Sequence, residues 1–504
     1  MSADTADTAE TADTANTADT PDTPDTAGNA GWEPVIGLEV HCELNTQTKL
    51  FCGCRNAFGD EPNTNVCPTC LGLPGSLPVL NIRAVEYAMR IGLALNCEVR
   101  PSIFHRKNYF YPDMPKDYQI SQYDAPINVN GWLELPDGSR VRIERAHMEE
   151  DTGKTSHIGG GGRIHDADHS LVDYNRAGVP LVEIVSAPDI RSSTQARLYA
   201  SELRAILVAT GASDGRMEEG SMRVDANVSV RRAGTYELGT RCEIKNLNSL
   251  RSLSRAIEYE IERQIGLLEA GDKVVQQTRH WNEDQGVTVA LRSKEEAFDY
   301  RYFPEPDLVP VVPDVRWQAE VAASVGPMPA ERRAKLAALF GPGPVGHARA
   351  DQIATVVEHR LDELVTAAAG AGVDSALALA RTSNEASSAP DAARLLDVPA
   401  FIALLRMEQD KKLSATQSKA VLIDMLENGG DPAEIARRRG FEALETGSLE
   451  TVVADVLAAH PEAWLRYQAG EDKLVGFFTG EVMKATKGRA DGEAVAAELR
   501  RRRA

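Results

Sequence analysis

The chain has 504 residues, of which 42% are hydrophobic and 26% charged, so it has room for about three domains and is too apolar for wholesale disorder. Its formal net charge of −20 excludes a generally basic nucleic-acid coat, although not a local nucleic-acid site. No uncharged apolar run approaches the roughly 18 residues of a membrane span, so we expect no membrane association. Seven cysteines, an odd number, argue against a secreted disulfide framework and favour a reducing, cytoplasmic location.

Residues 1–31 repeat alanine, aspartate and threonine, and they carry seven acidic residues and no basic one. The segment lacks the positive start and the apolar stretch of a signal peptide. Because it has nothing to bury, we expect a disordered, acidic, low-complexity tail.

The rest of the chain changes character near residue 325. Residues 32–325 contain alternating apolar and polar segments broken by glycine, proline and asparagine, which predicts strands with a few helices. The proline-rich stretch 303–313 should be irregular. After residue 326, alanine, leucine, arginine and glutamate dominate, which predicts helices; Asp431 followed by Pro432 and Glu434 is typical of a helix start. We therefore predict an α/β (α+β) catalytic domain over 32–325, an all-α linker over 326–400 and a small all-α tail domain over 401–504.

Four of the seven cysteines lie within nineteen positions, as Cys52-Gly-Cys54 and Cys67-Pro-Thr-Cys70. Two close pairs joined by a short loop supply the four thiolates of a closed, tetrahedral, structural zinc site. We expect this knuckle, residues 52–70, to hold a loop rather than to bind substrate. Cys42, Cys97 and Cys242 fall on apolar faces and should belong to the core.

Polar side chains recur along one face of several predicted strands. Glu39, His41 and Glu43 alternate with apolar residues, and the same alternation recurs at Arg223, Asp225, Asn227 and Ser229 and at Glu243 and Lys245. Two shorter segments, 147–151 and 181–185, also carry acidic residues. Each row could simply be the solvated side of a sheet. The rows are rich in carboxylates, however, which repel one another unless a cation lies among them. A magnesium–nucleotide site is therefore the functional alternative.

Between these rows, residues 104–122 combine basic and aromatic side chains. Arg106, Lys107 and Lys116 are interleaved with four aromatic residues: Tyr109, Phe110, Tyr111 and Tyr118. This composition suits phosphates and stacked bases, although a packed aromatic patch with solvated cations is an equal alternative. The glycine run 159–162 lacks the Lys-Ser/Thr ending of a phosphate loop and favours a mobile loop.

Several long motifs carry a family resemblance. They are Val35–His41, Arg106–Asp113, Tyr118–Gln122, His147–Lys154, Val172–Arg176, Met217–Arg223, Lys245–Asn248, Asp299–Asp307, Lys473–Phe478 and Val482–Gly488. Together they resemble the B subunit of the tRNA-dependent amidotransferase, densely over 32–316 and again near the C-terminus.

The resemblance implies a cradle-shaped catalytic domain that binds ATP, a helical linker and a helical tail that contacts tRNA. It implies ATP-dependent phosphorylation of the side-chain carboxylate of Glu-tRNA(Gln) or Asp-tRNA(Asn), followed by displacement of the phosphate by ammonia. Carried over by motif, Glu39, His41 and Glu150 would be catalytic. The magnesium ligands would come from Glu39, His41, Glu150, Glu183 and Asp225, and the cofactor-binding residues would be Arg106, Lys107, Lys116, Glu243 and Lys245.

The resemblance also implies a heterotrimer with a glutaminase (amidase) A subunit and a small C subunit. The sequence agrees, because it contains no Gly-Ser-rich amidase signature and its thiols are assigned to zinc or to the core. Two other interpretations remain: a diverged, stand-alone, metal-dependent phosphotransferase, and a non-catalytic tRNA-binding scaffold.

We expect the tail to bind the body of the tRNA. Residues 401–504 have a net charge of −1, and their basic residues cluster at Lys411, Lys412, Lys419, Arg437–Arg439, Lys484, Lys487, Arg489 and Arg500–Arg503. Solvated helix faces are the alternative interpretation of these clusters.

Overall fold

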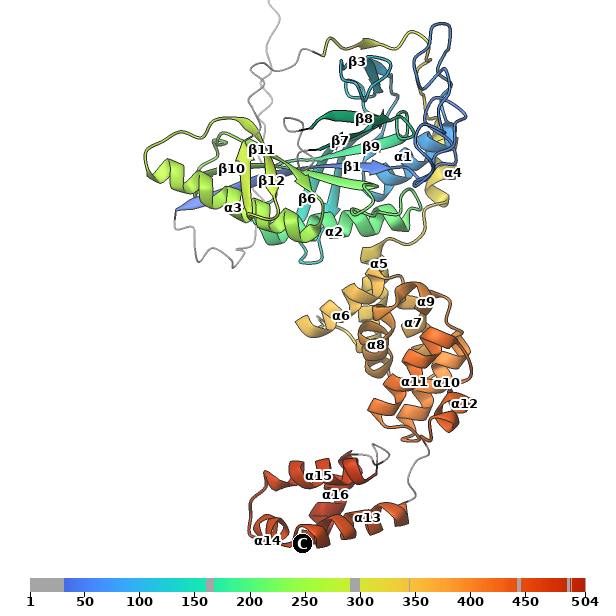
Figure 1. Cartoon of the computed structure of the whole chain (residues 1–504), viewed down its shortest axis with the longest axis vertical. Coiled ribbons are helices and arrows are strands. Elements are labelled where there is room, and N and C mark those ends of the chain that lie inside the picture. The colour runs from blue at the N-terminus through green and yellow to red at the C-terminus, as the bar shows by residue number, and fades with distance from the viewer. Residues whose placement is uncertain are drawn as a thin grey trace, which may run out of the picture. The chain divides into compact units, whose positions relative to one another are not determined.

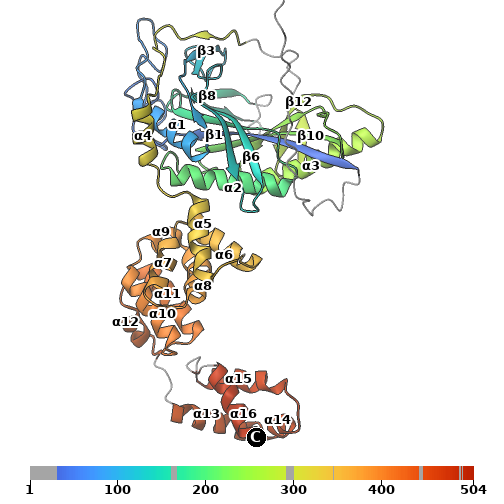
Figure 2. The same ribbon diagram turned by 180° about the vertical axis from the view of Figure 1, so that it is seen from behind.

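The computed structural model describes residues 31–159, 167–290, 300–343, 345–441, 446–486, 490 and 492–503 (Figures 1 and 2). The described chain forms two compact units. The first contains residues 31–40, 185–200 and 223–290, and the second contains 41–184, 201–222 and the residues from 300 onward. Strands β1 (Trp32–Glu43) and β9 (Pro180–Ser186) and helix α2 (Ser193–Ala209) each contribute residues to both units.

In the first unit, four strands lie in the order β13-β12-β11-β10. They are β10 (Met222–Arg232), β11 (Cys242–Leu247), β12 (Gln277–Asn282) and β13 (Val287–Ala290). Strands β11 and β12 are parallel, which requires a crossover, and helix α3 (Leu250–Glu269) provides it and packs on β11 and β13. The register of β10 against β11 shifts between Val224 and Ala226, so that Lys245 and Asn246 together oppose Asp225.

In the second unit, the strands follow the order β9-β6-β4-β3-β14, with β5 beside β6 and β2 beside β5. Their bounds are β2 (Glu98–Val99), β3 (His105–Asn108), β4 (Tyr118–Ser121), β5 (Asn128–Glu134), β6 (Arg140–Glu150) and β14 (Phe303–Pro304). A separate two-stranded ribbon joins β7 (Lys154–Ile158) to β8 (His169–Asp173). Helices α1 (Ile82–Ala94) and α4 (Val315–Ala323) pack against each other, and α1 also packs on β5 and β6. The stretch 303–313 is irregular apart from β14 and one bridge between Ser102 and Val311.

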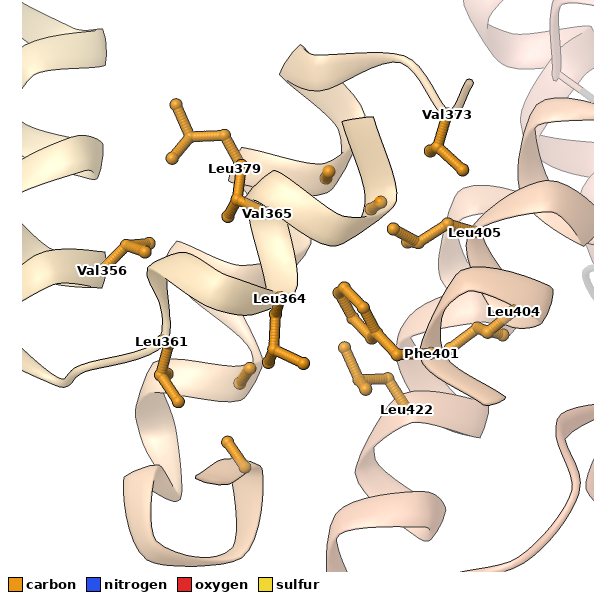
Figure 3. Close-up of a cluster of buried hydrophobic side chains, with 14 of the residues drawn as sticks. Val356, Leu361, Leu364, Val365, Val373, Leu379, Phe401, Leu404, Leu405 and Leu422 are labelled. Carbon is orange, nitrogen blue, oxygen red and sulfur yellow. The ribbon is translucent and has the colours of Figure 1, made fainter. Parts of the chain in front are cut away.

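The predicted helical region begins with a first core of short helices. It contains α5 (Pro329–Ala337), η2 (Ala338–Phe340), α6 (His347–Glu358), α7 (Asp362–Gly370), α8 (Ser375–Asn384), η3 (Ala386–Ser388), α9 (Pro390–Arg394), α10 (Val398–Gln409), α11 (Ala415–Asn428) and α12 (Pro432–Arg438). In Figure 3 the ring of Phe401 lies between Leu364 and Leu422. Asp431 caps α12 and Pro432 opens it, which confirms the predicted helix start.

The boundary that we placed at residue 400 falls inside helix α10. Phe401, Leu404 and Leu405 on this helix are fully buried together with side chains of α6, α7 and α8. The core of this helical part therefore runs from Leu336 to Phe441.

A second helical core contains α13 (Thr446–Ala459), α14 (Pro461–Gln468), α15 (Leu474–Ala485) and α16 (Gly492–Arg503). Val453, Phe478, Val482, Val495 and Leu499 are its fully buried members. The mixed α/β part followed by helical parts agrees with the predicted fold class. Residues 1–30 and most of the glycine run, residues 160–162, lie outside the described chain, as do Lys487 and Arg489.

Candidate active site and metal sites

The four knuckle cysteines converge in the loops that follow β1. The Sγ atoms of Cys52, Cys54, Cys67 and Cys70 all lie within 4.8 Å of one another. The backbone N–H of Cys67 donates to Cys70 Sγ at 3.1 Å, and the Nζ atom of the fully buried Lys49 lies 3.8 Å from the same sulfur. A hydrogen bond from Cys52 lowers the pKa of Cys70 to about 5. Four converging sulfurs with a cation beside them fit a tetrahedral zinc ion.

A second cluster joins His41 of β1, Glu149 of β6 and Glu183 of β9. Their candidate ligand atoms lie within 4.8 Å of one another, and His41 Nε2 is 3.8 Å from Glu149 Oε1 and 3.7 Å from Glu183 Oε2. Each residue comes from a different strand, so the cluster depends on strand order and not on local sequence. An imidazole and two carboxylates at this spacing fit a divalent cation that retains open positions for water or phosphate.

The electrostatics of this cluster also fit a cation. Burial, followed by the charge of Glu183, raises the pKa of Glu149 to about 7. Burial alone would also raise the pKa of Glu183, but the contacts with His41, His147 and Arg145 lower it below its usual range. Burial lowers the pKa of His147 to about 4, so this imidazole is neutral at pH 7. The two carboxylates can both be ionised only when positive charge lies among them.

Cations and tyrosines surround the cluster. Arg145 Nη2 lies 3.8 Å from Glu183 Oε1, and the Arg145 guanidinium lies over the ring of Tyr123 at 4.9 Å. Tyr123 stacks on Tyr302 with ring centroids 5.2 Å apart and 15° between the planes. Lys107 Nζ lies 4.8 Å above the ring of Tyr300.

Glu150 does not lie in this cluster. Its carboxylate forms an ion pair with Lys116 and accepts the N–H of Ile120 at 2.8 Å, and Glu150 is only 2% exposed. Because side chains alternate along a strand, adjacent Glu149 and Glu150 point to opposite faces of β6. Of the two adjacent acids, the structure brings Glu149, and not the predicted Glu150, to His41.

Arg106 also lies in the second unit, but its contacts are with residues outside the His41–Glu149–Glu183 cluster. Its Nε and Nη2 atoms donate to the buried carboxylate of Glu305 at 2.6 and 2.8 Å, and its guanidinium lies over the ring of Tyr118 at 4.3 Å. This contact joins β3 to the segment after β14. It therefore holds the backbone that carries Tyr302, instead of presenting a free cation to a phosphate.

The remaining predicted residues lie in the first unit. Asn227 Nδ2 donates to Glu39 Oε1 at 2.9 Å. Lys245 Nζ lies 2.8 Å from Asp225 Oδ2 and 2.7 Å from Glu243 Oε1. Burial would lower the pKa of Lys245, but these two carboxylates raise it. Lys245 follows Glu243 by two residues and so lies on the same face of β11, and the antiparallel register with β10 places it opposite Asp225.

Sequence reasoning did not single out Arg145, His147, Glu149 or Tyr302. Arg145, His147 and Glu149 alternate along β6, so the two-residue period of the motif was the available signal for them. Tyr302 lies in a motif that we quoted for the resemblance, but its stacking on Tyr123 depends on pairing between segments far apart in the chain.

Comparison with known proteins gives consistent results. A model described as the GatB/GatE catalytic domain matches residues 34–319, and a second, described as the GatB domain, matches residues 378–502. Three relatives are each named as the B subunit of an aspartyl/glutamyl-tRNA(Asn/Gln) amidotransferase. The relative from Carboxydothermus hydrogenoformans is 48% identical to this chain, and the alignment covers 93% of this chain and 98% of the relative. The relatives from Nocardioides sp. and Streptomyces coelicolor are 47% and 45% identical to this chain. Both alignments cover 92% of this chain, and they cover 96% and 95% of the two relatives, respectively.

Within the part of the chain that the structure describes, no helix is long and apolar enough to cross a membrane. The matched ranges cover the sheet region, with the His41–Glu149–Glu183 cluster, and most of the helical region. The chain therefore belongs to the family of aspartyl/glutamyl-tRNA(Asn/Gln) amidotransferase B subunits.

Proposed function

We propose that this chain is the B subunit of a glutamine-dependent ligase that converts Glu-tRNA(Gln), Asp-tRNA(Asn) or both into the amidated aminoacyl-tRNA. In the first step the side-chain carboxylate attacks the γ-phosphorus of ATP, giving an acyl phosphate and ADP. In the second step ammonia attacks the acyl carbon, and phosphate leaves as the amide forms. Family membership supports the reaction, and the His41–Glu149–Glu183 cluster is the observation that supports its chemistry here.

We assign Mg²⁺ to His41, Glu149 and Glu183. When bound, the ion neutralises charge on the transferred phosphoryl group. His147 holds no charge at neutral pH and packs beside Glu183, so it keeps that carboxylate oriented without competing for the cation. Lys107 and Arg145 are the nearby cations that we assign to phosphate oxygens.

Arg106 and Lys116 receive a supporting role in this proposal, because buried carboxylates already neutralise both. In the first unit, Glu39 and Asp225 remain proposed magnesium ligands, and Glu243 and Lys245 remain proposed cofactor-binding residues. Their arrangement supports this: a cation held between two acids can exchange one of them for a phosphate.

We propose that one zinc ion binds the four knuckle cysteines and holds their loop. The other three thiols are unsuited to glutamine hydrolysis, because burial raises the pKa of Cys42 and Cys97 to about 12 and that of Cys242 to about 11. Ammonia must then come from a partner, and we propose a heterotrimer with a glutaminase A subunit and a small C subunit. Free thiols and a thiolate metal site also favour a reducing, cytoplasmic location.

We propose that the helical tail, residues 401–504, binds tRNA. Fewer of its basic side chains are available to phosphates than the sequence suggested, because several form ion pairs within the tail. Arg438 and Arg439 contact the carboxylate of Asp424, and Arg501 and Arg502 contact Glu498. These arginines are partly neutralised before any phosphate arrives. Truncation after Phe441, where the first helical core ends, should lower the affinity for tRNA and reduce its salt dependence. An unchanged salt slope would contradict this part of the proposal.

The decisive experiment co-expresses the chain with candidate A and C subunits and measures amide formation on both mischarged tRNAs. We expect ATP-dependent and glutamine-dependent product with the complex, and product with the isolated chain only when ammonium is supplied. His41→Ala should abolish amidation while glutamine hydrolysis by the partner continues. Glutamine-dependent amidation by the isolated chain, or full activity of His41→Ala, would contradict the proposal.

A further inference from the structure

Three tyrosines, Tyr123, Tyr300 and Tyr302, form an aromatic wall next to the His41–Glu149–Glu183 cluster. The proposed chemistry gives these rings no role. Tyr123 follows β4 and Tyr302 precedes β14, and the two rings stack although 179 positions separate them in the sequence. Tyr123 is 46% exposed, so part of its ring is open to a ligand. The stacked pair lies beside the cluster, because the ring of Tyr123 meets the ring of His147 edge to face at 6.1 Å and His147 Nε2 is 3.7 Å from Glu183 Oε2.

Two cations complete this wall. Arg145 lies over Tyr123, and Lys107 lies over Tyr300, which meets Tyr302 edge to face at 6.1 Å. The contacts between Arg145 and acids are long, 3.8 Å to Glu183 and 3.9 Å to Glu144. Its Nε atom is buried and has no hydrogen-bond partner among the described residues. A buried guanidinium N–H without a partner is costly unless a ligand accepts from it.

Resting on the proposed function, we infer that the Tyr123–Tyr302 stack binds the adenine base of an adenosine unit on the face of Tyr123 that Arg145 covers in this structure, with Arg145 moving aside to contact the phosphate. Aromatic rings with an adjacent arginine are the combination that holds a stacked base and its backbone phosphate. In this reaction two adenosine units approach the cluster, one in ATP and the other at the 3′ end of the aminoacyl-tRNA. Both carry the same base, so the experiment must tell them apart.

The experiment uses the complete complex and two variants that remove a ring, Tyr123→Leu and Tyr302→Leu. Loss of one stacking contact should raise the KM and the Kd for one of the two substrates by roughly 5- to 150-fold, with a much smaller change in kcat. A higher KM and Kd for ATP would show that the tyrosines bind the adenine of ATP. A higher KM and Kd for aminoacyl-tRNA would show that they bind its terminal adenosine. Tyr123→Phe retains the ring and should recover most of the lost affinity, whereas Tyr236→Leu, which removes a 92% exposed tyrosine outside the site, is the matched control.

Equilibrium binding of magnesium–ATP and of uncharged tRNA is measured beside the kinetics. If the wild-type complex forms no amide on either tRNA, the proposed function fails, while the binding data still test the aromatic wall. If both affinities stay within about twofold in both leucine variants of a correctly folded complex, the inference is overturned. A loss of kcat alone, with both affinities retained, would overturn it as well.

Discussion

Substitution of the adjacent acids Glu149 and Glu150 by glutamine should have different effects. Glu150→Gln should lower the stability of the protein, and Glu149→Gln should lower its activity. Glu150 and the Lys116 side chain are 2% and 6% exposed, so Glu150→Gln leaves a buried ammonium without its counter-charge. Breaking such a pair costs about 3–5 kcal/mol of folding free energy. For a domain of about 290 residues, matching the range 34–319, the unfolding entropy converts this into a fall in Tm of about 5–8 °C.

Glu149→Gln should leave Tm within about 2 °C, because the substitution removes a charge that Glu183 opposes and that burial disfavours. It should instead lower the rate of carboxylate activation at least about 100-fold, since one ligand of the proposed cation is lost. The assay pairs thermal unfolding without added divalent ions with amide formation by the complex. A stable Glu150→Gln protein together with an active Glu149→Gln enzyme would refute the assignment of the two acids.

Three further outcomes are expected. Cys70→Ser should lower the zinc content from one ion per chain and loosen the knuckle, and a zinc-free wild type purified without chelators would contradict the site. Phe401→Ala should destabilise the first helical core by about 3–5 kcal/mol in denaturant unfolding, and a loss below about 1 kcal/mol would contradict its central position. Hydrogen bonds from Arg501 lower the pKa of Glu498 to about 2 from 4.5, so its stabilising contribution is complete above about pH 4.5 and is lost as the pH falls toward 2. Thermal unfolding of Glu498→Gln should therefore depend less on pH between 5 and 3 than that of the wild type, and equal dependence would contradict the ion pair.

The two-residue period of polar and apolar side chains predicted the faces of β1, β10 and β11 from sequence, and the cysteine spacing predicted a group that the fold brings together. These signals are local. Glu149 and Glu150 point to opposite faces of β6. Which of the two reaches His41 depends on how β6 pairs with strands that are distant in sequence. The commitment of Arg106 to Glu305 depends on a contact across 199 positions, which no local pattern contains. The limit of the first helical core was misjudged at residue 400 for the same reason, since burial of Phe401 depends on helices that precede it.

The arrangement of β6 has a consequence for how this sequence can change over generations. One strand presents a candidate metal ligand on one side and half of a buried ion pair on the other, at consecutive positions. Insertion or deletion of a single residue within Arg140–Glu150 would exchange the two sides at once and damage both. Length variation in related chains should therefore be excluded from this strand and tolerated in the turn between β5 and β6, where Asp137 and Gly138 are exposed.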